Sequence, residues 1–184
     1  MRRLFVLLAA IFASTCMMAQ SRADSIDVTT VVGSFDDLKS VRKLHFQEDW
    51  TQVEINGMTV DEWLDYRQAT QPEWDADHEW EYELKPRAKE TLMTANEAFE
   101  RTGILLTTSA TASHTLVFRP LSVDRKGNQV DECVVRDNQT GRDVVTFYVV
   151  GKGGTFGSMS NLWGDGFRSA GKRLARMLKR NLLK

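Results

Sequence analysis

The second half of the chain shows the clearest pattern of strands. Segments rich in Val, Thr, Phe and Leu are separated by short links that contain Gly and Asn, which tolerate positive φ angles. This arrangement is typical of antiparallel strands joined by tight turns. We therefore expect strands at 104–107, 115–120, 129–136 and 144–150, the last three forming a three-stranded meander.

Helical spacing dominates the middle of the chain. Thr59 and Glu62 have the spacing of a capping box, which predicts a short helix from there to about residue 69. Apolar residues then recur at the helical period, and this predicts helix over most of 73–101. Because proline lacks a backbone N–H, we expect a break or kink at Pro86.

The C-terminal segment combines an apolar stripe with strong positive charge. We expect an amphipathic helix over about 166–182, in which Phe167, Gly171, Leu174 and Leu178 share one face. From residue 165 to the end there are seven basic residues and one acid. The basic face would be solvated if the stripe packs on the sheet, and it could also bind an anionic membrane or an acidic partner. The residues of this basic face are Arg168, Lys172, Arg176, Lys179 and Arg180.

Together these elements predict the fold class. Residues 41–55 contain one or two further strands, and a short strand could lie near 26–32. The sequence predicts a single α+β domain, with mixed α/β as the alternative. Its sheet would be mostly antiparallel and end in the meander, its helices would pack on one side, and the amphipathic helix would come last.

The first residues have the order of a secretory signal. A short basic start precedes an uncharged run at 4–13, and small and polar residues follow. The apolar run is too short for a membrane-spanning helix, which needs about 20 residues. A buried N-terminal helix is the alternative interpretation.

The expected processing of this signal defines the domain boundaries. We expect a signal peptide over 1–19, with a cut after Ala23 or before Cys16 as alternatives, the last giving a lipoprotein. Residues 20–40 would be a leader and 41–184 the domain. The expected location is the periplasm or cell envelope of a Gram-negative bacterium.

Composition and cysteine content narrow the classes of protein. The chain has 184 residues and a net charge of −1, and this balance of charge excludes a generally basic protein that coats nucleic acid. Hydrophobic residues make up 42% and charged residues 27%, a composition that excludes a wholly disordered chain. We expect no nucleic-acid partner.

Cys16 and Cys133 are the two cysteines, and Cys16 would leave with the signal. Cys133 then cannot form an internal disulfide, and we expect it to be buried as a small hydrophobe.

Aromatic and acidic residues gather between positions 49 and 80. Tryptophans beside acidic residues are typical of sugar-binding sites. Glycoside hydrolysis also needs two carboxylates on either side of a cleft, and the sequence does not identify such a pair. Their helical spacing favours packing in the core or at an interface. The tryptophans are Trp50, Trp63, Trp74 and Trp80, and the neighbouring acids are Asp49, Asp61, Asp75 and Asp77.

Other candidate features give no reaction centre. The glycine-rich stretch 151–157 follows a strand but lacks the spacing of a phosphate-binding loop, so we expect it to cross closely over the sheet. His45, His78 and His114 are scattered, without the spacing of metal ligands. We predict no catalytic residue, no cofactor and no metal site.

Part of the second half resembles a known type of protein. The residues that carry the resemblance are SHTLVFRP at 113–120, VVRDNQTG at 134–141, GGTFG at 153–157 and Ala170-Gly171. Residues 98–178 are similar to uncharacterised bacterial envelope proteins of the domain-of-unknown-function type. They resemble penicillin-binding-protein activator lipoproteins more remotely. The shared motifs are structural, so the resemblance implies a secreted α/β domain and carries over no catalytic residue.

The sequence thus predicts an exported envelope protein that binds a partner or forms part of an assembly, without enzymatic activity. We expect an envelope protein as that partner. One alternative is a glycan-binding or glycan-processing protein that uses the tryptophans at 50–80. The other is peripheral attachment to an anionic membrane through the basic C-terminal helix.

Overall fold

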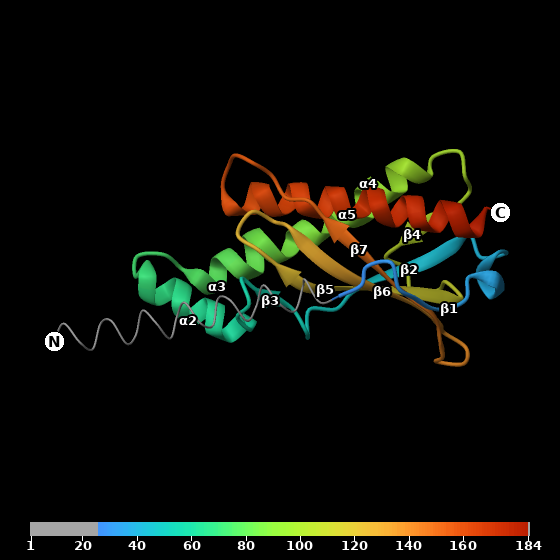
Figure 1. Cartoon of the computed structure of the whole chain (residues 1–184), viewed down its shortest axis with the longest axis horizontal. Coiled ribbons are helices and arrows are strands. Elements are labelled where there is room, and N and C mark those ends of the chain that lie inside the picture. Colours follow the sequence, from blue (N-terminus) through green and yellow to red (C-terminus); the bar gives the residue numbers. More distant parts are fainter. Residues whose placement is uncertain (1–25, 184) are drawn as a thin grey trace.

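The computed structural model describes residues 26–183, and its strands follow the predicted order (Figure 1). The predicted signal peptide and Cys16 lie outside these residues. The strands are β1 (Val31–Gly33), β2 (Lys43–Glu48), β3 (Glu54–Ile55), β4 (Leu105–Thr107), β5 (His114–Val123), β6 (Gln129–Asp137) and β7 (Asp143–Gly151).

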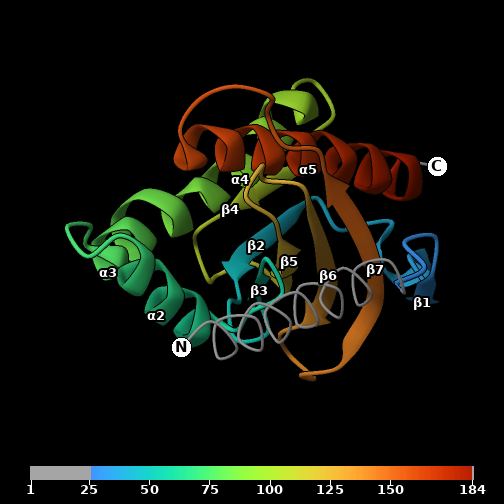
Figure 2. The same ribbon diagram turned by 60° about the vertical axis from the view of Figure 1, so that its left-hand side comes forward.

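These strands form one mixed sheet. Its order is β1-β7-β6-β5-β2-β4, and β3 pairs with β5 beside this path. β5, β6 and β7 are the predicted antiparallel meander, and β1 joins β7 antiparallel. β2 runs parallel to β4 and β5. The long helices lie on one face of the sheet (Figure 2), which confirms a single α+β domain.

The helical middle of the chain is close to prediction. α2 (Val60–Thr70) begins with the predicted capping box: the backbone N–H of Glu62 donates to Thr59 Oγ1, 3.3 Å away, and the Thr59 N–H donates to Glu62 Oε2, 2.9 Å away. A nearly continuous helical path then runs from residue 76 to 99. It consists of α3 (Ala76–His78), the π-helical turn η2 (Glu79–Leu84), the 3-10 turn η3 (Lys85–Ala88) and α4 (Lys89–Phe99).

The change of helix type falls where proline was expected to interrupt the helix. Pro86 is in the first turn of η3, directly after the π-helical turn. Because proline cannot donate the i→i−4 hydrogen bond, the hydrogen-bond pattern of the helix changes around Pro86. The helix continues as α4 beyond it.

The last helix, α5 (Met159–Leu182), is longer than expected. The prediction of a start near 166 was wrong because the glycines before it looked like loop residues. Instead Ser158 caps the helix, accepting a hydrogen bond from the Asn161 N–H at 3.3 Å. Gly166 is helical and lies directly against the backbone of Gly127, in the β5–β6 turn. Glycine is used here for close packing of two backbones.

The sheet also begins earlier than the expected domain start at residue 41. Val31–Gly33 pairs with β7, and a short 3-10 turn, η1 (Asp36–Leu38), follows. Phe35 and Leu38 are buried in the core, and the Phe35 ring contacts the Phe147 ring with centroids 5.5 Å apart. The second half of the expected leader is therefore an edge of the folded domain.

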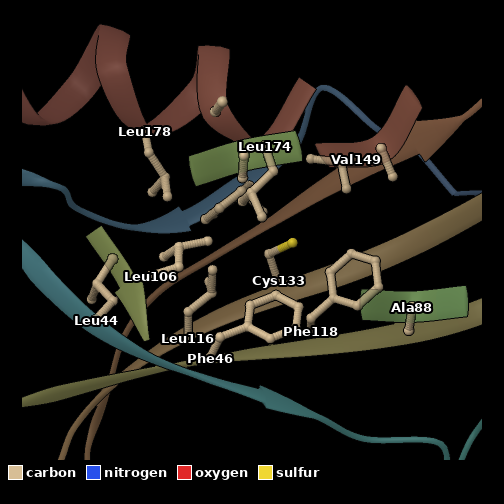
Figure 3. Close-up of a cluster of buried hydrophobic side chains, with 14 of the residues drawn as sticks. Leu44, Phe46, Ala88, Leu106, Leu116, Phe118, Cys133, Val149, Leu174 and Leu178 are labelled. Carbon is tan, nitrogen blue, oxygen red and sulfur yellow. The ribbon is translucent and has the colours of Figure 1, made fainter. Parts of the chain in front are cut away.

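The core lies between the sheet and the helices α4 and α5. Figure 3 shows Leu174 and Leu178 of α5 pointing toward Leu116 and Phe118 of the sheet. Cys133 lies among these side chains and is fully buried, as predicted. Burial raises the pKa of its thiol well above the usual range, which disfavours the reactive thiolate.

Candidate functional site

Four of the five predicted basic residues surround one groove. The groove has a volume of about 600 Å³ and lies between the end of α4 and the C-terminal half of α5. Apolar side chains from both helices contribute to its lining, with cationic side chains beside them. The lining residues are Ala98, Lys172, Ala175, Arg176, Lys179, Arg180 and Leu183.

The groove exists because α4 and α5 run side by side in the same direction. Thr91 Oγ1 donates to the Phe167 carbonyl oxygen, 3.1 Å away, and further along the pair Lys179 Nζ donates to the Ala98 carbonyl oxygen at 3.2 Å. A Cβ atom on Gly171 would come within 2.6 Å of the Thr91 carbonyl oxygen, so the helices approach closely there. The small side chains Ala98 and Ala175 leave the hollow that the longer cationic side chains border.

The cations of the groove differ in what they contact. Lys179 satisfies a carbonyl group in the last turn of α4, where a cation also suits the helix dipole. Arg180 donates to Met177 Sδ at 3.2 Å. Lys172 and Arg176 are exposed, and neither makes an ion pair or hydrogen bond with any residue of 26–183. The positive charges of these two side chains are therefore available to a ligand.

Arg168 does not line the groove. Its guanidinium group contacts Asp165 at 2.6 Å and Glu90 of α4 at 3.3 Å. The hydrogen bond to Asp165 is the main cause of its raised pKa, and burial opposes it. Arg168 therefore connects α5 to α4, and the prediction that it shares a binding face with the other four residues is not supported by its position.

The tryptophans are divided between core and surface. Trp63 and Trp80 are 2% and 5% exposed, in agreement with the core-packing interpretation. Trp50 is half-buried and meets the Trp80 ring edge-to-face, with centroids 5.4 Å apart. Trp74 is 41% exposed beneath the Arg67 guanidinium group, which lies 5.7 Å from its ring centroid. The four tryptophans therefore do not form one exposed aromatic surface.

Arg67 itself is fixed by a second contact. It forms two hydrogen bonds with Glu79, of 2.8 Å and 3.0 Å, and the Glu79 side chain is buried. This bidentate pair, whose hydrogen bonds raise the pKa of Arg67, connects α2 to the π-helical turn. Its geometry and burial indicate a structural role.

The glycine loop approaches its neighbours closely, but these neighbours are the β5–β6 turn and α5, where the sheet was expected. A Cβ atom on Gly153 would overlap the Lys126 carbonyl oxygen, and one on Gly154 would come within 2.8 Å of Leu162 Cδ2. The Gly153 N–H donates to Asn128 Oδ1 at 3.1 Å. The loop is packed against the β5–β6 turn and α5, and its N–H at 153 already has a partner.

The three histidines lie in separate surroundings. His45 contacts Thr115 at 3.3 Å, His114 contacts Ser113 at 2.9 Å, and the His78 ring packs on Tyr82. Within residues 26–183 no three His, Cys, Asp or Glu side chains come together as metal ligands would. In the same part of the chain, no helix is long and apolar enough to cross a membrane.

The structure also contains a buried acid that the sequence analysis missed. Asp131 is fully buried, and its Oδ2 accepts a hydrogen bond from Gln129 Nε2 at 3.0 Å. Asp131 Oδ1 and Gln129 Oε1 have no partner within the described residues. Burial raises the pKa of Asp131 well above 3.8. The alternation of strand 129–136 could have revealed it, because residue 131 shares the inward face with Cys133.

Comparisons with known proteins identify no family. No family model matches the chain, and no curated protein matches it. Among solved structures, it is similar to the PelC dodecamer from Paraburkholderia phytofirmans, with 12% identity and a TM-score of 0.35 over 74% of this chain and 86% of that one. It is also similar to an uncharacterised protein, with 11% identity and a TM-score of 0.38 over 74% and 90%. Likeness at this level assigns neither a fold family nor a function.

Proposed function

We propose that the protein is an exported, non-enzymatic component of the bacterial cell envelope that binds an acidic segment of a partner protein in the basic groove of α5. The observation that carries the binding role is the convergence of Lys172, Arg176, Lys179 and Arg180 on one groove. Export is supported by the basic, apolar and small-residue order of the first 23 residues.

The chemistry of the groove favours an acidic, partly apolar ligand. Lys172 and Arg176 offer positive charge without a competing carboxylate contact in residues 26–183. Ala98 and Leu183 offer apolar surface beside the cations, whereas Ala175 is buried at the base of the groove. A peptide that places acidic side chains beside small apolar ones would pair with both, and opposite charge would also speed its association.

An anionic membrane is the competing partner, and the packing of α5 argues against it. Membrane-surface helices bury an apolar face among the lipids. In this protein Phe167, Leu174 and Leu178 are fully buried against the rest of the domain. Attachment to lipid would therefore depend on charge alone, whereas a concave groove suits a protruding peptide segment.

Charge reversal in the groove tests the binding role. We expect Lys172→Glu with Arg176→Glu to weaken binding of a Glu/Asp-rich peptide about tenfold, because two favourable charge contacts become repulsive. The matched control is Arg125→Glu with Lys126→Glu, two exposed residues of the β5–β6 turn. It changes the net charge equally and should leave affinity nearly unchanged.

Peptide titrations followed by fluorescence anisotropy at fixed ionic strength measure the affinity of both double variants and of the native protein for the peptide. Sedimentation with phosphatidylglycerol vesicles forms the second arm. If the two variants weaken peptide binding equally, the groove is not the site. If only vesicle binding depends on Lys172 and Arg176, the membrane is the partner and the peptide proposal fails.

The N-terminus of the protein made in a Gram-negative host tests export. We expect the periplasmic fraction to contain a chain beginning at Gln20 or Asp24, because signal peptidase removes the apolar segment after a small residue. Intact-mass spectrometry of the fractions measures this. A mass increased by acyl chains on Cys16 would show a lipoprotein, whereas an intact chain from Met1 in the cytosol would contradict export.

A further inference from the structure

A second open pocket lies between β3 and the start of α2. Helix α2 lies on the side of the domain away from the C-terminus (Figure 1). Its volume is about 410 Å³, within the range of about 300–1,000 Å³ that is usual for small-molecule sites. The lining residues are Trp50, Thr51, Gln52, Val53, Glu54, Thr59, Val60 and Asp61. They combine one large aromatic ring with hydroxyl, amide and carboxylate groups.

The aromatic ring of this pocket is held in place. Trp50 Nε1 donates to Glu48 Oε2 at 3.2 Å. The edges of its neighbours Trp80 and Phe167 fix the ring from the core, with centroid distances of 5.4 Å and 6.0 Å. Trp50 is nevertheless only half-buried, and it is one of the residues that line the pocket. A rigid, partly exposed indole is a suitable stacking surface, because little entropy is lost when a ligand covers it.

The hydroxyl groups of the pocket are fixed by their neighbours. Thr51 Oγ1 donates to Asp49 Oδ1 at 2.6 Å. Thr59 Oγ1 contacts Glu62 in the capping box of α2. These bonds hold the two walls of the pocket in fixed positions.

Gln52 and Asp61 supply the available polar groups. Both side chains are exposed, and within residues 26–183 neither forms a hydrogen bond or ion pair. The amide of Gln52 can both donate and accept hydrogen bonds, and the carboxylate of Asp61 accepts them. This combination suits a ligand with several hydroxyl groups.

We propose that this pocket binds an uncharged saccharide. The apolar C–H face of a pyranose ring would stack on Trp50, while its hydroxyl groups donate to Asp61 and exchange hydrogen bonds with Gln52. The carboxylate of Asp61 in the lining disfavours a phosphorylated or uronic-acid sugar. The role is binding, without cleavage, and it is independent of the basic groove.

The sugar site therefore differs from the one that the run of tryptophans suggests. Trp63 and Trp80 are buried, and Trp74 lies under Arg67. Trp50 is the member of that group that lines this pocket. Residues 51–61, which follow it directly in the chain, supply the polar groups.

Saccharide titrations of the mature protein test the proposal. The probes are cellotriose and the trimer of N-acetylglucosamine, with trigalacturonate as the anionic comparison. Binding is followed by isothermal titration calorimetry and by the indole N–H signals in NMR spectra. We expect a neutral trimer to bind, to shift the Trp50 signal, and to bind more tightly than trigalacturonate.

Substitutions on the pocket wall locate the site without disturbing the core. We expect Asp61→Ala to weaken binding of the neutral trimer about tenfold, the loss of a hydrogen bond to a charged group. The matched control is Asp65→Ala, one turn further along α2, which is exposed and is not among the lining residues. The proposal is overturned if neither neutral trimer binds, or if the two variants weaken binding equally. Loss of peptide binding at the basic groove would not affect these outcomes.

Discussion

Gly166→Ala is expected to lower the free energy of unfolding by about 3 kcal/mol or more, because overpacking against a rigid backbone cannot be relieved by a rotamer change. A Cβ atom at this position would overlap the Gly127 carbonyl oxygen and lie 3.2 Å from Gln129 Oε1. Gly127 is itself constrained, with a φ of +80° and with the backbone of Leu162 pressed against it. To admit a methyl group, α5 would have to move away from the β5–β6 turn.

The control for this prediction lies two residues earlier in the same helix. A Cβ atom on Gly164 would meet its nearest neighbours, in Arg168 and Arg87, at 3.5–3.7 Å, which is ordinary van der Waals contact. Gly164→Ala should therefore leave stability unchanged or raise it by up to about 1 kcal/mol through helix propensity. Urea denaturation followed by tryptophan fluorescence measures both variants. Equal effects would show that the close approach of Gly166 to Gly127 does not determine stability.

Asp131→Asn is expected to stabilise the protein at neutral and alkaline pH. Asp131 is fully buried, with its Oδ1 unpaired among the described residues, and burial raises the pKa of its carboxyl group well above 3.8. Ionisation in the folded state is therefore costly, and each unit of raised pKa removes about 1.4 kcal/mol of stability once the group is charged. An asparagine side chain cannot ionise, and its amide could donate to the unpaired Gln129 Oε1.

The direction of the pH dependence follows from this raised pKa. Between the unfolded and the folded pKa of Asp131, the folded protein binds more protons than the unfolded chain, so stability falls as the pH rises. The stability that the protonated Asp131 carboxyl group contributes to the folded protein is fully present below a pH of about 3.8. This stability is lost as the pH rises through the pKa of Asp131 in the folded protein. The D131N variant should therefore match the native protein near pH 3 and exceed its stability by more than about 1 kcal/mol at pH 8.

The difference between the two proteins isolates Asp131 from other titrating groups. Burial acts to raise the pKa of Asp49, but hydrogen bonds from Thr51 and the hydrogen bond and charge of Arg119 together outweigh it and lower that pKa. The amides of the β6–β7 turn lower the pKa of Asp137, so both groups act in the opposite direction to Asp131. Their contributions are present in both proteins and cancel.

Denaturant midpoints from about pH 3 to 8 supply the measurement, with the exposed Asp65→Asn as the control. The control makes the same Asp→Asn change on the exposed surface, so the comparison shows what depends on burial of the carboxyl group. Parallel pH profiles for native protein and D131N would contradict the prediction.

Local chemistry was enough to predict most of the elements. The capping box at Thr59 and Glu62 forms as expected because its two hydrogen bonds join residues three apart. The meander forms from adjacent strands whose turns contain Gly127 and Gly141, both with positive φ. The apolar stripe of α5 identified Phe167, Leu174 and Leu178 as buried residues, because a helix repeats its face every 3.6 residues.

The candidate sites were predicted only in part. The basic residues of α5 are visible in the sequence, but the groove also needs Ala98, which α4 brings from a distant part of the chain. A similar separation hides the pairing of Arg168 with Glu90, which removes this cation from the groove. The aromatic run at 50–80 likewise gave no means of telling buried Trp63 from Trp50, which lines a pocket.

The sequence by itself therefore determined most of the secondary elements, the cap of α2, the turns of the meander, the apolar face of α5 and the α+β class, because each depends on residues close together in the chain. The tertiary structure alone decided which strands pair in parallel, where α5 begins and which charges are neutralised. Gly166 shows the reason most directly: its place in the helix depends on the backbone of Gly127, a contact that no local spacing records.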